Sequence, residues 1–282
     1  MAAGPLNDQQ VADYHDVGYV IARDMFDSTE IDLLRRSAKD DRAHNDHAMN
    51  RADGEGGHVR VSLWNHPGNG IYGMFARCHT IVDSMEKLLG GEVYHYHSKI
   101  IMKDPKVGGA WTWHQDFGYW YQNGILWPLM ASVVIAVAPA TKENGCMQVL
   151  RGSHHCGRFS HVRTGQQAGA DMEPVNELKN RVPLDYCQLE PGDAMFFHCN
   201  LLHRSDANKS DKPRWAMICC YNAARNDPYK DSHHPRYTPL DKVPDSRITE
   251  VGVTRIDDEA TDPNWMALPP DGRFRYVSER SD

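Results

Sequence analysis

The stretch Trp113-His114-Gln115-Asp116 carries the most specific chemical signal in this sequence of 282 residues. In an extended conformation His114 and Asp116 would project to the same side, because side chains alternate along a strand. A third ligand is then needed, and His203, which follows an apolar run at 194–198, is the candidate. Two histidines and one carboxylate form the facial triad of non-haem Fe(II) oxygenases, which leaves three coordination positions open. The motif therefore predicts an iron site that could also take a bidentate 2-oxo acid and O2.

Two further residues close to the third ligand favour the same chemistry. Arg214 lies 11 residues after His203, inside a predicted strand, and its guanidinium could bind the distal carboxylate of 2-oxoglutarate through two hydrogen bonds. Ser205 could donate its hydroxyl to the same carboxylate. A His-x-Asp tripeptide alone is common in proteins, so the combination carries the prediction.

The sequence around the motif has the pattern of a β protein. Short apolar runs alternate with turns and predict strands at 93–102, 130–138, 147–150, 186–189, 194–198 and 216–221. Many short strands at this spacing are typical of a sandwich or barrel. Helical patterns at 7–16, 28–40 and 81–89, with a short strand at 17–22, place helices outside the sheets. Residues 41–58 are polar and predict a loop, and the tail from Asp227 predicts irregular covering structure. No linker divides the chain, so we expect one domain over residues 1–282.

Composition limits the classes of protein that the chain can belong to. Lys and Arg number 31 against 38 Asp and Glu, which gives a net charge of −7 and argues against a nucleic-acid surface. No apolar run is long enough for a membrane span, and the first ten residues lack the pattern of a signal peptide. The seven cysteines form no C-x-x-C pair, which favours reduced thiols in the cytoplasm. We therefore expect a cytoplasmic monomer or homodimer whose partner is a small-molecule substrate, with no nucleic acid and no membrane.

Motifs along most of the chain resemble the phytanoyl-CoA dioxygenase family of Fe(II)/2-oxoglutarate oxygenases, which includes the ectoine hydroxylases. The matching pieces are the helix-strand-helix pattern at 9–36, Trp113–Phe117, Thr141–Cys146, Arg151–His154, Leu189–Asp193 and Leu202–Ser205 with Arg214. The resemblance implies a double-stranded β-helix, a jelly roll of the cupin-like type. It also implies Fe(II), 2-oxoglutarate and O2 as cofactor and co-substrates.

The resemblance also assigns roles to individual residues. It implies that Arg214 and Ser205 bind 2-oxoglutarate, and that Lys99 and Ser132 make additional contacts with it. Related halogenases carry a small residue in place of the carboxylate, so Asp116 indicates a hydroxylase.

Aromatic and polar residues near the motif are candidates for binding the substrate. If the strand continued beyond His114, Trp120 would form a wall over the open coordination positions, and an aromatic face suits an ammonium group. The candidate substrate-binding residues are Trp120, Phe117, His97, Asn222 and Arg225, with Arg236 facing the same cavity. Histidines 44, 47, 154, 155 and 198 are expected not to bind metal.

These candidates favour a small polar or zwitterionic substrate, such as an ectoine-like amino acid derivative or an aminoalkylphosphonate. Two alternatives remain open. An acyl-CoA substrate is disfavoured because no run of lysines and arginines is present for the CoA phosphates. A metal-binding jelly roll without catalysis is disfavoured by the complete triad with Arg214.

Overall fold

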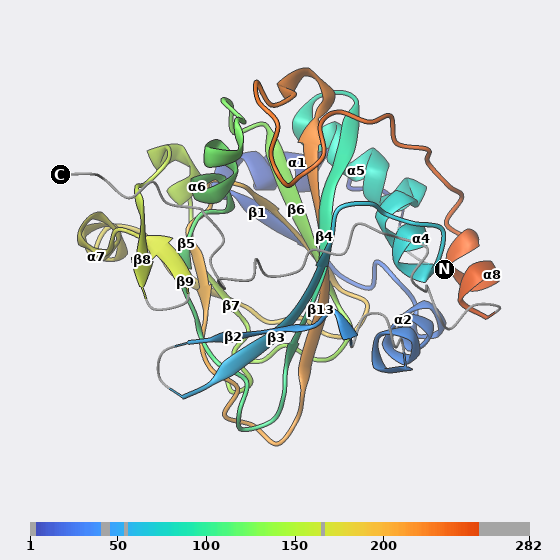
Figure 1. Ribbon diagram of the computed structural model, residues 1–282, viewed down its shortest axis with the longest axis horizontal. Helices are drawn as coiled ribbons and strands as arrows, with labels where there is room; N and C mark the ends of the chain where they lie inside the picture. Colours follow the sequence, from blue (N-terminus) through green and yellow to red (C-terminus); the bar gives the residue numbers. More distant parts are fainter. Residues whose placement is uncertain (1–3, 41–45, 54–55, 165–166, 254–282) are drawn as a thin grey trace.

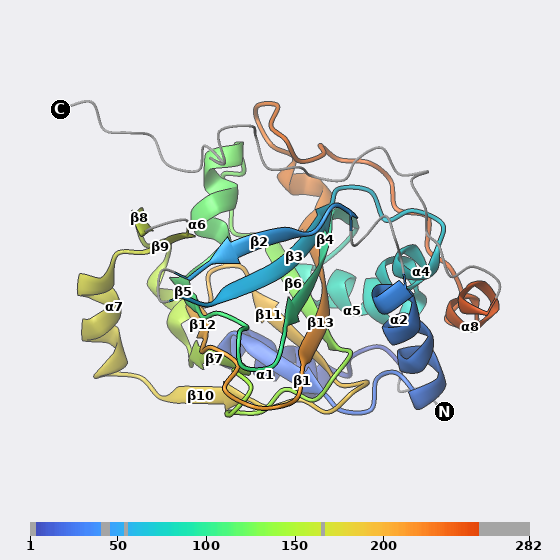
Figure 2. The same ribbon diagram turned by 60° about the horizontal axis from the view of Figure 1, so that its bottom comes forward.

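Two antiparallel sheets face each other in the computed structural model, which describes residues 4–40, 46–53, 56–164 and 167–253. The larger sheet has the strand order β1 (Tyr19–Ala22), β11 (Ala194–His198), β6 (Met130–Ala136), β13 (Arg214–Ala223), β4 (Val93–Lys103), β3 (His58–Trp64) and β2 (Met49–Ala52). The smaller sheet has the order β10 (Leu184–Cys187), β7 (Met147–Leu150), β12 (His203–Ser205) and β5 (Trp111–His114). This arrangement is the double-stranded β-helix that the sequence predicted (Figures 1 and 2).

The central strands are apolar on both faces because both faces are covered. All seven residues of β6 are buried. Val134 on β6 faces the interior between the sheets, where its register partner on β13 is Ile218. Val133 belongs instead to the outer cluster, against the helices. Such double burial accounts for the continuous apolar run that predicted this strand.

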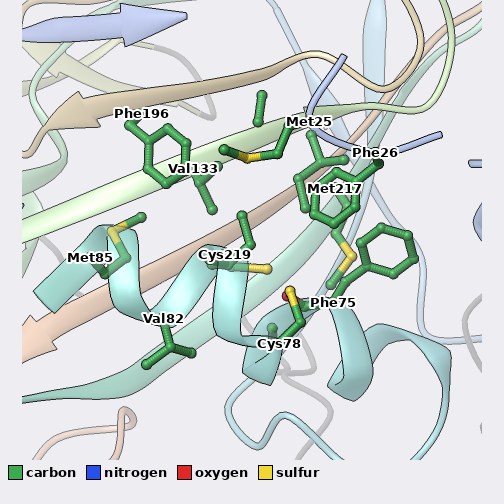
Figure 3. Close-up of a cluster of buried hydrophobic side chains, with 14 of the residues drawn as sticks. Met25, Phe26, Phe75, Cys78, Val82, Met85, Val133, Phe196, Met217 and Cys219 are labelled. Carbon is green, nitrogen blue, oxygen red and sulfur yellow. The ribbon is translucent and has the colours of Figure 1, made fainter. Parts of the chain in front are cut away.

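Helices cover the outer face of the larger sheet. They are α1 (Asp8–Val17), α2 (Ser28–Asp40), α4 (Ile71–Arg77), α5 (His79–Leu89) and α8 (Arg247–Gly252), and the last four gather on one side of the molecule (Figure 1). Val82 and Met85 of α5 belong to the same buried cluster as Val133, Phe196 and Cys219 of the sheet (Figure 3). None of the helices in the described part of the chain is long and apolar enough to cross a membrane.

The prediction of a loop over 41–58 is wrong in part. Residues 49–52 form β2 at the sheet edge, and β3 begins at His58. Edge strands pair through their main chains and bury little, so β2 shows no apolar alternation in its sequence. Residues 41–45 and 54–55 lie outside the described residues. Helix α4 and strand β3 were not predicted either.

A two-stranded hairpin and a helix lie at the end of the two sheets where the His114-Gln115-Asp116 motif is located. The hairpin β8 (His161–Thr164) and β9 (Gln167–Ala170) lies beside β5 and α6 (Asp116–Trp120), and α7 (Met172–Lys179) follows it (Figure 2). Short 3-10 turns follow at Tyr121–Asn123, Ser153–Cys156 and Ala224–Asn226. The backbone N–H of Gln115 donates to His161 Nε2 at 3.0 Å, and the fully buried Gln115 side chain bonds Gly157, Phe159 and Asn200. Gln115 thus joins the start of α6 to the hairpin.

Replacement of Gly118 by alanine tests how closely the hairpin approaches α6. A Cβ on Gly118 would overlap the ring of His161, so the ring or the helix must shift. Alanine within a helix is more favourable than glycine by about 1 kcal/mol of folding free energy, but overpacking costs about 1–3 kcal/mol. The overlap is severe, so we expect the cost to exceed the gain and Gly118→Ala to lower the free energy of unfolding in urea by a net of up to about 2 kcal/mol. Gly4→Ala is the control, since nothing in the described chain lies within 4 Å of a Cβ there. A variant at least as stable as the native protein would contradict this packing.

Candidate active site

The three predicted metal ligands meet at the mouth of the barrel. His114 ends β5, His203 begins β12, and the two are register partners across these strands. Their ring centroids are 4.0 Å apart, and His114 Nε2 lies 3.9 Å from Asp116 Oδ1. One ligand atom from each of the three residues lies within 4.8 Å of the others, and all three side chains are buried.

The route by which Asp116 reaches this point differs from the prediction. The strand ends at His114 and Asp116 is the first residue of α6, so the two side chains do not share one face of a strand. The chain turns at Gln115 instead, which is held as described above. The expected convergence therefore comes from a strand-to-helix turn and not from alternation.

The backbone fixes the tautomer of both histidines. His114 Nδ1 lies 2.8 Å from the carbonyl oxygen of Thr112, and His203 Nδ1 lies 2.9 Å from that of Leu201. A carbonyl only accepts, so each Nδ1 must carry the proton and each Nε2 is left with a lone pair. Burial lowers the pKa of both imidazoles, most strongly that of His114, where His203 adds to the effect. Both rings are thus neutral and oriented as metal ligands require.

Ser132 holds the carboxylate ligand. Its hydroxyl donates to Asp116 Oδ2 at 3.1 Å, and the serine side chain is fully buried on β6. Asp116 Oδ1 remains on the side of His114. Two oriented imidazoles and one oriented carboxylate, all buried together, fit an Fe(II) ion bound on one face.

A cavity of about 120 Å³ lies directly beside the three ligands. Three residues predicted to act here, Trp120, His97 and Lys99, do line it. The remaining lining comes from Met49, Arg51, Val61, Leu63, Trp111, Tyr119, Gln167, Ala168 and His234, together with His114 and Asp116. Trp120 reaches the cavity from α6, so the expectation that it lies on a continuing strand is wrong although its location is as expected.

Aromatic rings form one wall of this cavity. His97 and His234 are stacked with centroids 4.7 Å apart and planes at 19°, and Trp120 lies edge-on to His97 at 5.8 Å. His97 faces the interior by ordinary alternation with Lys99 on β4. The bulge at Tyr96, which has no partner on β13, lies beyond His97 and brings Tyr94 and Tyr96 to the inner face as well. His234 comes from the covering segment, which Asn65 fixes through Asn65 Oδ1 to His234 Nδ1 at 2.8 Å and Asn65 Nδ2 to the carbonyl oxygen of His233 at 2.6 Å. The only signal for this residue in the sequence is the pair His233-His234.

Arg214 lies deeper in the barrel, on the inner face of β13. Its side chain is 6% exposed, and it lines a narrow cavity with Val134, Met147 and Met195. In the described part of the chain its guanidinium has no hydrogen-bond or ion-pair partner, and Nε is fully buried. A buried, unpaired guanidinium indicates a site for an anion.

Several other predicted residues lie away from the cavity lining. Phe117 packs in the inner core, with its N–H donating to Cys199. Asn222 is fully buried and donates to Tyr94 and Asn226. Arg225 binds the carbonyl oxygens of Leu89 and Gly90, and Arg236 pairs with Asp227 at the surface. His154 and His198 lie outside the ligand cluster, near His15 and Tyr14.

Comparison with known families and curated proteins gives consistent matches. The family described as phytanoyl-CoA dioxygenase (PhyH) matches residues 14–216. L-proline trans-4-hydroxylase of Streptomyces griseoviridis is 29% identical over 214 residues, which cover 70% of this chain and 79% of that protein. Ectoine dioxygenase of Sphingopyxis alaskensis is 26% identical over 237 residues, which cover 79% of this chain and 78% of that protein.

Solved structures share the fold. EctD from S. alaskensis with 2-oxoglutarate and 5-hydroxyectoine superposes with a TM-score of 0.72 at 24% identity, over 86% of this chain and 89% of that one. The same protein with bound Fe gives 0.73, with the same identity and coverage. The carbocyclase SnoK from nogalamycin biosynthesis gives 0.66 at 23% identity, over 84% of this chain and all of that one.

Ser132→Ala tests whether this hydroxyl orients the carboxylate ligand. Loss of a group that holds a metal ligand lowers metal affinity by about 10- to 100-fold. We expect that loss in an anaerobic titration with Fe(II), or with Co(II) followed by its visible absorption. Ser98→Ala is the matched control, because Ser98 is equally buried in the same sheet, on β4, and its hydroxyl bonds His95 instead of a metal ligand. Equal metal affinities for the two variants would exclude the role.

Proposed function

The chain belongs to the phytanoyl-CoA dioxygenase family, the 2-oxoglutarate-dependent hydroxylases, and we propose that it hydroxylates an unactivated C–H bond of a small polar or zwitterionic metabolite. One observation carries the proposal. Three buried ligand residues, each oriented by its own hydrogen bond, converge beside a cavity of about 120 Å³.

His114, Asp116 and His203 would hold Fe(II) in this proposal. Iron at this position supplies the chemistry that couples oxidative decarboxylation of 2-oxoglutarate to hydroxylation by O2. The chain keeps both imidazoles neutral, fixes their Nε2 lone pairs and surrounds the ligands with apolar walls. These contributions exclude bulk water and set which bond of the substrate lies near the metal.

Arg214 and Ser205 are proposed to bind the distal carboxylate of 2-oxoglutarate. Ser205 lies two residues beyond His203, and both side chains are buried on the same face of β12. Lys99 is a proposed further contact, because its ammonium has no hydrogen-bond or ion-pair partner among the described residues and lines the cavity beside the triad. Ser132 was expected to contact 2-oxoglutarate. We propose instead that its hydroxyl positions Asp116, to which it donates a hydrogen bond.

The cavity supports a small substrate. Its volume of about 120 Å³ suits a molecule of amino-acid size. The wall of His97, His234 and Trp120 suits an ammonium group, and the guanidinium of Arg51, which also lines the cavity, suits an acidic group. The named substrates of the relatives above, proline and ectoine, are small molecules as well. A purely metal-binding role would leave the buried Arg214 without a function.

A substrate panel tests the proposed function. Purified protein with Fe(II), 2-oxoglutarate and O2 should release succinate several-fold faster with one of a set of cyclic amino acids, ectoine-like compounds or aminoalkylphosphonates. Mass spectrometry should show a gain of one oxygen in that compound. If only an acyl-CoA stimulates succinate release, the substrate class is wrong. If nothing does and metal still binds, the non-catalytic reading stands.

Arg214→Ala should weaken 2-oxoglutarate binding much more than metal binding. Removing one partner of a buried, charge-assisted pair costs about 2–5 kcal/mol, which corresponds to roughly 30- to several-thousand-fold in affinity. Calorimetric titration of 2-oxoglutarate into the anaerobic Fe(II) protein measures the loss. Arg151→Ala is the control, since Arg151 binds Asp185 through two hydrogen bonds at the surface. Unchanged affinity in Arg214→Ala would transfer the role to Lys99.

Trp120→Leu should raise the KM for an ammonium-bearing substrate and leave 2-oxoglutarate affinity almost unchanged. Leucine keeps apolar bulk but removes the π-face, which contributes about 0.5–2 kcal/mol to binding a desolvated cation. Trp120→Phe keeps a face and should retain most of the affinity. Equal losses in both variants would indicate shape alone, and no loss in either would remove Trp120 from substrate binding.

A further inference from the structure

Lys103 is a buried cation that the sequence did not single out. It is the last residue of β4 and the register partner of Arg214 on β13, so both side chains occupy one end of the barrel interior. Its side chain is 1% exposed. Lys103 Nζ donates to Ser205 Oγ at 2.7 Å and to the carbonyl oxygen of Asp206 at 2.6 Å. A lysine is rarely buried to this degree without a specific partner.

The first of these hydrogen bonds determines what Ser205 can offer. A lysine ammonium carries only donors, so Ser205 Oγ must be the acceptor in this pair. The serine hydrogen then points elsewhere, and it has no acceptor in the described part of the chain. Lys103 therefore leaves Ser205 as a donor for a group that is not part of the protein.

The charges around Lys103 indicate the same kind of group. Arg214, its register partner, has no counter-charge of its own among the described residues. The carboxylate of Asp206 acts electrostatically on Lys103, but Arg204 and Gln148 already bind its two oxygens. Burial, and then the charge of Arg214, lower the pKa of Lys103 well below its usual range. Two buried cations beside a committed hydroxyl donor form a site that is stabilised when an anion binds.

We propose that Lys103 is a positioning residue for 2-oxoglutarate: it commits the Ser205 hydroxyl to donate, and with Arg214 it makes the site selective for an acid with a second carboxylate. The inference rests on the proposed function, which places the distal carboxylate at Arg214 and Ser205. It predicts that Lys103 distinguishes 2-oxoglutarate from 2-oxopentanoate, which has the same chain length and ends in a methyl group.

The test compares the affinities of these two acids for Lys103→Met. Both are titrated into anaerobic Fe(II) protein by calorimetry, with the iron affinity measured separately. We expect the Kd for 2-oxoglutarate to rise about 10- to 100-fold, as for loss of a charge-assisted contact. The Kd for 2-oxopentanoate and the iron affinity should stay within about two-fold, because neither uses Lys103. A two-fold change or less for 2-oxoglutarate, or equal losses for both acids, would overturn the proposal.

Further variants separate the components of the effect. Lys106→Met is the matched control, since Lys106 follows β4 closely and also donates to a backbone carbonyl but is exposed. In a Ser205→Ala background Lys103→Met should cost clearly less than in the native protein, because part of its action runs through Ser205. Equal costs in the two backgrounds would overturn that part of the proposal.

Two further variants, Lys103→Gln and Arg214→Ala, keep the test decisive. If Lys103→Met does not fold, Lys103→Gln takes its place, because the amide still donates to Ser205 but removes the charge. Its ratio of affinities for the two acids should then fall, and an unchanged ratio would overturn the selectivity. Arg214→Ala distinguishes the two levels of inference. If it retains 2-oxoglutarate affinity, the proposed site is wrong; if only Lys103→Met retains it, the role of Lys103 alone is wrong.

Discussion

The pairing of β12 with β5 is the constraint on which the site depends. It sets His203 opposite His114, so two imidazoles face each other at one point before any metal binds. The hydrogen bonds of each Nδ1 to its own strand turn this proximity into a fixed orientation. Because main-chain pairing and backbone carbonyls supply both effects, the arrangement needs no metal to form.

The interior of the larger sheet carries the rest of the chemistry in one row. Along β4 the inward side chains run from His97 at the substrate cavity, through Lys99 beside the metal ligands, to Lys103 at the far end. Arg214 on β13 completes that end. Lys103 and Arg214 therefore lie at the far, buried end of this row, and His97 lies at the other end, with the aromatic rings of the cavity. A dicarboxylic acid and a second small molecule could each occupy its own part of one interior.

The parts of the fold that sequence reasoning predicted are those whose signal is local. Buried strands such as β6 and β13 appear as apolar runs, and the metal ligands appear as a short motif with a histidine beyond it. The strand-to-helix turn at Gln115 was missed because hydrogen bonds to residues 42 and 85 positions away fix it. The position of His234 depends on the contact of the covering segment with Asn65, which is far away in the sequence. Lys103 could not be recognised from the sequence, since its meaning comes from its distant partners Arg214 and Ser205.

The cavity has a divided origin. The metal ligands belong to β5, β12 and the start of α6, whereas part of the cavity wall comes from the edge strand β2, the hairpin strand β9 and the covering segment with His234. These peripheral pieces hold none of the three metal ligands. Changes in them could alter which molecule fits while the oxygen-activating centre stays intact. The residues that bind the metal and part of the residues that shape the cavity therefore lie on different elements. A protein of this fold can acquire a new substrate through changes in the second set while its metal site stays the same.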